Sequence, residues 1–197
     1  MCIRDSSWPV LKNICDQKIN QKNHKKIREQ KLKQQQQKDQ EKKERQQKII
    51  NIKIDDDIIN ALHSRRKKRD EPVILVVEDD IFSQRLVKNI INKNYDVATA
   101  KNGHEAITTY VQEAPDILFL DIELPDINGH DVLSKIFEID ESAHVVMLSG
   151  NGDRKNIMKA IEKGAKGFIG KPFTRDKIFQ YIESSPHIKK KQKKEYA

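Results

Sequence analysis

A set of acidic, hydroxyl and amino side chains follows short apolar runs in the middle of this 197-residue chain. In chain order these residues are Glu78, Asp79, Asp80, Asp121, Ser149 and Lys171. Carboxylates that are packed closely repel one another, and a hard divalent cation with oxygen ligands relieves that repulsion. If the chain brings these residues together, we expect a magnesium site with a lysine and a hydroxyl beside it.

Each feature alone has an ordinary structural explanation. An acidic run after a strand is typical of a helix N-cap, a Lys-Pro pair is typical of a turn, and a single serine carries little information. The order and spacing favour a functional interpretation. Asp79 and Asp121 are 42 residues apart, Asp121 and Ser149 are 28 apart, and Ser149 and Lys171 are 22 apart.

The elements that would position these residues are visible as a regular alternation from residue 71 onward. Apolar runs predict strands at 73–77, 95–99, 117–120, 144–148 and 167–170, and helical patterns lie near 81–93, 103–113, 129–138, 153–163 and 174–184. Strict alternation of strand and helix indicates an α/β fold in which helices cover both faces of a parallel sheet. Loops at the carboxyl ends of parallel strands gather at one edge, where ligands bind.

Four stretches carry a more specific pattern: ILVVEDD at 74–80, DILFLDIELPDING at 116–129, VMLSG at 146–150 and GAKGFIGKPF at 164–173. Together they resemble the receiver domains of two-component response regulators, over residues 72–184. The resemblance implies a flavodoxin-like, doubly wound sheet with strand order 2-1-3-4-5 and five helices.

The resemblance also implies a role for each candidate residue. Asp121 would be the phosphoacceptor, a nucleophile toward the phosphoryl group of a phosphohistidine. Lys171 and Ser149 would contact the phosphoryl oxygens. The cofactor would be Mg²⁺, whose protein ligands would be Glu78, Asp79, Asp121 and the backbone carbonyl of Glu123. Such a domain is not a conventional enzyme, although it catalyses its own phosphorylation and dephosphorylation.

A conformational switch and two sets of partners are implied as well. Ser149 would bind the new phosphoryl group and Phe168 would rotate toward the core, which changes the face formed by residues 153–182, where a downstream protein binds. The Lys171-Pro172 bond is a candidate cis peptide. The phosphodonor would be a histidine kinase or a histidine phosphotransfer protein, and donor specificity would reside in the helix near 81–93 and the adjoining loops.

Charge divides the chain into three parts. Residues 1–70 carry 20 basic and 10 acidic side chains, residues 71–185 carry 13 and 19, and residues 186–197 carry 5 and 1. We interpret 1–70 as a Lys- and Gln-rich extension or linker, largely disordered or helical, 71–185 as the receiver, and 186–197 as a basic tail. Within the extension, 49–63 is expected to form a short amphipathic helix that packs on a neighbouring domain. Residues 1–6 resemble the translation of a sequencing-library adapter.

Composition excludes some functional classes. Apolar runs of about five residues are far shorter than the roughly 18 that a membrane span needs, so we expect a cytoplasmic protein. Nuclear entry would depend on the basic clusters 65–69 and 189–194, which we interpret as solvated flanks of the folded domain. Nucleic acid is an unlikely partner, because no aromatic residues that could stack on bases interleave with these clusters.

Three alternatives stay open. The receiver stands alone or is the C-terminal receiver of a hybrid histidine kinase. It also could be a pseudo-receiver or scaffold whose basic flanks bind a polyanion or a protein. A haloacid-dehalogenase phosphatase is disfavoured, because that family needs an aspartate two residues after the nucleophile, where this chain has Glu123.

Overall fold

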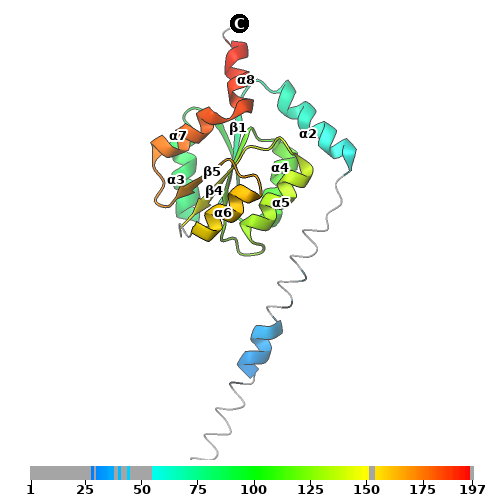
Figure 1. The fold of residues 1–197 in the computed structure, drawn as a ribbon, viewed down its shortest axis with the longest axis vertical. Coiled ribbons are helices and arrows are strands. Elements are labelled where there is room, and N and C mark those ends of the chain that lie inside the picture. The colour runs from blue at the N-terminus through cyan, green and yellow to red at the C-terminus, as the bar shows by residue number, and fades with distance from the viewer. Residues whose placement is uncertain are drawn as a thin grey trace, which may run out of the picture. The chain divides into compact units, whose positions relative to one another are not determined.

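A parallel sheet lies at the centre of the fold (Figure 1). The computed structural model describes residues 28, 30–37, 40, 44, 55–150 and 154–195. Within these residues the sheet has five strands in the order β2-β1-β3-β4-β5, all neighbours parallel. The strands are β1 (Val73–Val77), β2 (Asp96–Ala100), β3 (Ile117–Asp121), β4 (Val145–Ser149) and β5 (Gly167–Gly170). The predicted fold class and strand order are confirmed.

Helices cover both faces of the sheet, because the strand residues alternate between two apolar clusters. The first cluster contains Leu75, Leu118 and Met147 and is covered by α4 (Gly103–Glu113), α5 (Gly129–Ile139) and α6 (Arg154–Glu162). The second contains Ile74, Phe119 and Val146 and is covered by α3 (Ile81–Ile91) and α7 (Arg175–Ser184). Burial on both faces explains why β1, β3 and β4 are apolar along most of their length.

The described residues contain helices beyond the five predicted around the sheet: residues 30–37 are helical, and α2 and α8 lie immediately before and after the receiver in the chain. Helix α2 (Asp56–Lys68) lies where a helix over 49–63 was expected, but it begins and ends later; residues 49–54 lie outside the described residues. Leu62 joins the first apolar cluster, so α2 packs on the receiver itself. Helix α8 (Pro186–Glu195) occupies the expected basic tail. A proline in the first turn favours helix initiation, and Ile188 is buried in the second cluster.

Buried polar contacts also attach α2. The Arg66 guanidinium is 2.7 Å from Asp140 Oδ2 and donates to the Tyr110 hydroxyl at 3.1 Å. That hydroxyl in turn donates to Asp140 Oδ2 at 2.8 Å. All three side chains are buried, so an extension that composition describes as a linker contributes a charged residue to the interior.

Gly129, the first residue of α5, allows the helix to approach the end of β3 closely. A Cβ at this position would overlap the carbonyl oxygen of Asp121 and would lie 2.8 Å from Cα of Ile122. We expect Gly129→Ala to lower the free energy of unfolding by about 1–3 kcal/mol, as overpacking does. Urea denaturation measures this.

Gly170→Ala is the matched control for that substitution. Nothing lies within 4 Å of a Cβ at Gly170, so we expect a change within about 0.5 kcal/mol. An equal loss of stability in the two variants would contradict the packing explanation.

None of the helices in the described ranges combines the length and the apolar character that crossing a membrane requires.

Candidate functional site

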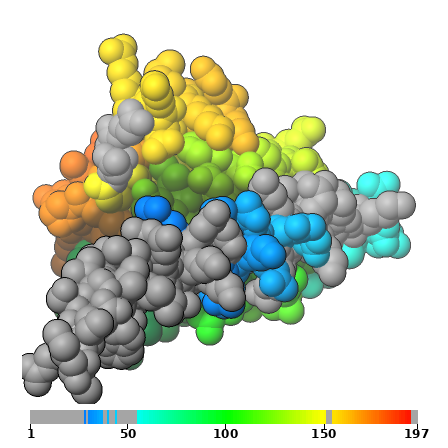
Figure 2. Space-filling view, turned by 90° about the horizontal axis from the view of Figure 1, so that it is seen from below, coloured from blue at the N-terminus to red at the C-terminus, as the bar shows by residue number. Residues whose placement is uncertain are grey.

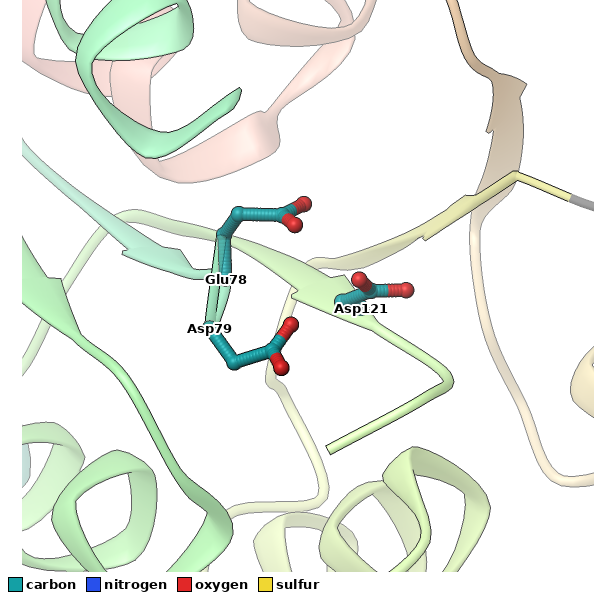
Figure 3. A group of neighbouring side chains, drawn as sticks. All are labelled: Glu78, Asp79 and Asp121. Carbon is teal, nitrogen blue, oxygen red and sulfur yellow. The ribbon is translucent and has the colours of Figure 1, made fainter. Parts of the chain in front are cut away.

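Three carboxylates meet at the carboxyl edge of the sheet (Figure 3). Glu78 and Asp79 directly follow β1, and Asp121 ends the neighbouring strand β3. One carboxylate oxygen of each lies within 4.8 Å of the others. Glu78 and Asp121 are buried, whereas Asp79 is exposed. The cluster is therefore open to solvent on the Asp79 side.

Lys171 reaches this cluster from β5, on the far side of β4. Its ammonium donates to Glu78 Oε1 at 2.7 Å and to Asp121 Oδ2 at 2.8 Å. Its backbone N–H donates to the Ser149 carbonyl at 2.8 Å, which fixes the start of the loop after β5. The peptide bond between Lys171 and Pro172 is cis.

The charges of these groups are not balanced. Burial and the nearby charge of Asp121 together raise the pKa of Glu78 to about 7, although the hydrogen bond from Lys171 opposes them. For Lys171, burial lowers the pKa, but the hydrogen bonds to Asp121 and Glu78 outweigh it and the net pKa is raised. One ammonium thus faces three carboxylates, and protonation of Glu78 is one way to relieve the repulsion.

A divalent cation is the other way, and the residues present fit one. Every candidate ligand is a carboxylate oxygen, the donor type that hard cations such as Mg²⁺ prefer. Glu78 Oε2 is buried and has no hydrogen-bond partner among the described residues. Such an atom is costly to bury unless something binds it. Glu123 is exposed and its N–H donates to Asp121 Oδ1 at 3.3 Å; its carbonyl as a ligand stays a prediction.

The third acidic residue after β1 has a different role. Asp80 is the N-cap of α3, and its carboxylate accepts from the Ser83 N–H at 2.8 Å. That bond lowers the pKa of Asp80. The ordinary N-cap explanation therefore holds for Asp80, while Glu78 and Asp79 lie in the carboxylate cluster.

Two residues that position the site were not predicted from the sequence. Gln84 Nε2 donates at 3.0 Å to the carbonyls of both Glu78 and Ala100, which ties α3 to the ends of β1 and β2. Asp126 accepts from the N–H groups of Gly103 at 2.7 Å and His104 at 2.9 Å. It thereby fastens the loop after β3 to the start of α4, where a carboxylate is favourable. Nothing in their spacing signalled either contact.

The two residues predicted to act as a switch lie on neighbouring strands. Ser149 is buried at the end of β4, one residue beyond Leu148, which pairs with Asp121. Phe168 lies in β5, opposite Met147 of β4, and is partly buried against the first apolar cluster. The Tyr181 hydroxyl contacts its backbone N–H and carbonyl, both at 3.4 Å. The structure brings Ser149 to the edge that holds Asp121, and it places Phe168 further back along the sheet.

Comparison with known proteins matches residues 74–183 to the family model described as the response regulator receiver domain. The chain belongs to this family. The matched segment begins in β1 and ends in α7, so it contains the carboxylate cluster, Ser149 and Lys171.

Curated relatives and solved structures that are similar to this receiver agree with the assignment. The chemotaxis protein CheY of Listeria monocytogenes is 41% identical over 115 residues, which are 57% of this chain and 96% of that protein. The Thermotoga maritima CheY is 38% identical over 111 residues, 55% of this chain and 92% of that protein. The solved CheX-CheY-BeF3-Mg²⁺ complex of Borrelia burgdorferi matches with 34% identity and a TM-score of 0.55, over 57% of this chain and 87% of that one.

Proposed function

We propose that this receiver is a phosphorelay component that accepts a phosphoryl group from a phosphohistidine onto Asp121, with Mg²⁺ as cofactor. The observation that carries the proposal is the position of Asp121, 2.8 Å from the Lys171 ammonium and beside two further carboxylates. The relationship to CheY proteins, one of which was solved with BeF3 and Mg²⁺, supports the same chemistry.

Asp121, Lys171 and Ser149 each have a role in the proposed transfer of the phosphoryl group from the histidine to Asp121. A carboxylate oxygen of Asp121 bonds to phosphorus as the bond between phosphorus and the histidine nitrogen breaks, and the nitrogen keeps the electron pair. Lys171 donates to phosphoryl oxygens and stabilises their negative charge. Bound Mg²⁺, held by Glu78, Asp79 and Asp121, with the Glu123 carbonyl as a fourth protein ligand, would supply further charge neutralisation. Ser149 then offers a hydroxyl to the acyl phosphate.

Metal removal tests this proposal directly. We expect the full chain to gain one labile phosphoryl group from phosphoramidate in Mg²⁺, detected by intact-mass analysis. With excess EDTA the rate falls at least about 100-fold, because a bound metal is worth several kcal/mol of transition-state stabilisation. A folded protein that gains no phosphoryl group with Mg²⁺ would instead support the pseudo-receiver or scaffold function.

The donor surface that we propose lies on α3, which begins immediately after the carboxylates. Ile81 is 60% exposed, Phe82 80% and Leu86 48%. Large apolar side chains that are exposed together mark a protein-binding surface. Their position beside Asp121 suits a protein that must bring its phosphohistidine to the carboxylate.

We expect Phe82→Ser to slow phosphoryl transfer from a phosphohistidine-bearing kinase or phosphotransfer domain about tenfold or more, the effect of losing a central apolar contact. Phosphorylation by phosphoramidate is expected to be unchanged, because this small donor needs no docking surface. Radiolabel transfer and intact mass measure the two rates.

Met158→Ser is the control for the donor surface. Met158 is 49% exposed on α6, whose side chains project from the domain (Figure 2). That helix belongs to the face of residues 153–182, which we propose binds the downstream partner instead of the donor. Equal slowing by both substitutions would contradict the assignment of the donor to α3.

A further inference from the structure

A cavity of about 470 Å³ lies between α2 and α8, at the amino edge of the sheet and therefore opposite the carboxylate cluster. This volume is in the range of small-molecule sites. Among its lining residues are His63, Arg66 and Lys67 of α2 and His187, Lys190 and Lys191 of α8. Two helices that the receiver family pattern did not predict thus form a basic cavity together.

The negative charges at this cavity are already engaged by other groups. Asp116, the one carboxylate that lines the cavity among the described residues, is fully buried. Its Oδ2 accepts from Arg69 Nη2, Lys191 Nζ and the Val73 N–H, each at 2.9 Å. Asp140, behind the cavity, is paired with Arg66. Asp116 and Asp140 are thus already contacted by Arg66, Arg69 and Lys191, and Asp116 Oδ1 is buried without a hydrogen-bond partner among the described residues.

Lys67 and Lys190 supply uncompensated charge. Both are exposed, and in the described ranges neither forms an ion pair. Burial lowers the pKa of Lys191, the hydrogen bond and charge of Asp116 oppose this, and the charges of Arg69 and Arg66 lower it further. Like charges around one cavity repel one another and are stabilised by an anion between them.

We propose that this cavity binds a compact small-molecule polyanion, of the polyphosphate or polycarboxylate type, which bridges Lys67 of α2 and Lys190 of α8. A multivalent anion fits better than a single charge because the free cations lie on two separate helices. Binding would join α2 to α8 and stabilise the folded state by mass action. The site is independent of Asp121 and of the proposed phosphoryl transfer.

Calorimetric titration of the full chain with tripolyphosphate, and separately with citrate, tests the proposal. We expect saturable one-to-one binding of at least one of them and no comparable binding of sulfate at equal ionic strength. Lys67→Gln combined with Lys190→Gln is expected to weaken binding about tenfold or more, because two charge-assisted contacts are lost. Both positions are exposed, so folding should survive, which circular dichroism checks. The two ligands distinguish phosphate from carboxylate recognition.

The matched control is Lys189→Gln combined with Lys193→Gln, which removes the same charge from exposed positions of α8 outside the cavity lining. This variant and Asp121→Asn are expected to bind like the wild type. Equal weakening by the two lysine pairs, or binding that never saturates, would overturn the proposal and show diffuse attraction to the basic chain.

Discussion

Asp121→Asn is expected to abolish phosphorylation of the chain by phosphoramidate, even in saturating Mg²⁺. The amide has nearly the same shape as the carboxylate, but its nitrogen is not a nucleophile toward phosphorus, and the acyl phosphate cannot form. Because Lys171 also contacts Glu78 at 2.7 Å, its ammonium keeps a partner in the variant. Intact-mass analysis over a time course measures the loss.

Asp96→Asn is the control for this experiment. Asp96 is exposed at the first position of β2, where it pairs with Val73 at the amino end of β1, far from the carboxylate cluster. It should be phosphorylated like the wild type. An adduct of unchanged size in Asp121→Asn, from protein with native circular dichroism, would move the acceptor to another side chain and refute the proposed mechanism.

Arg66→Ala is expected to lower the free energy of unfolding by about 3–5 kcal/mol, the usual cost of removing one partner of a buried ion pair. The Asp140 carboxylate is fully buried and would lose its guanidinium partner at 2.7 Å. The contact between α2 and the hydroxyl of Tyr110 would be lost in the same variant. Urea denaturation measures the change, and Lys68→Ala, an exposed position of the same helix, is expected to stay within about 0.5 kcal/mol.

The pH dependence of this variant gives a second readout. Burial raises the pKa of Asp140, but Arg66 and the hydrogen bonds from Ser142 and Tyr110 outweigh it, so the net pKa is lowered. A carboxyl with a lowered folded pKa adds stability above its unfolded value of about 4 and loses it as the pH falls further. We therefore expect the wild type to lose its advantage over Arg66→Ala below about pH 4. A difference that is constant with pH would contradict a role for this charge pair.

The sheet and most of the carboxylate cluster could be predicted because they depend on local patterns. Runs such as 73–77 and 117–120 are apolar at every position, which is sufficient to indicate strands buried on both faces. Residues at the carboxyl ends of parallel strands must share an edge, so Glu78, Asp121 and Lys171 could be assigned to one site without a structure. The four stretches around these residues carried the resemblance to the family.

Contacts between distant polar side chains could not be predicted in this way. Gln84 lies on a helical pattern like any other polar residue, and only the packing of α3 brings its amide to the carbonyls of Glu78 and Ala100. The same is true of α2: an apolar residue every fourth position predicted a helix, but Arg66 is buried because Asp140 lies opposite it. No sequence pattern marks an arginine for burial.

The sequence by itself thus determined the parallel α/β sheet, the edge at which the site forms and the residue types that meet there, because hydrophobic periodicity and chain order control these features. The strand order followed from the family resemblance alone. Only the tertiary structure decided which charges pair. Lys171 contacts Glu78 across 93 residues of chain, and α2 and α8 together line a basic cavity. Such pairings depend on distances of a few ångströms between segments far apart in the chain, and the order of residues does not specify those distances.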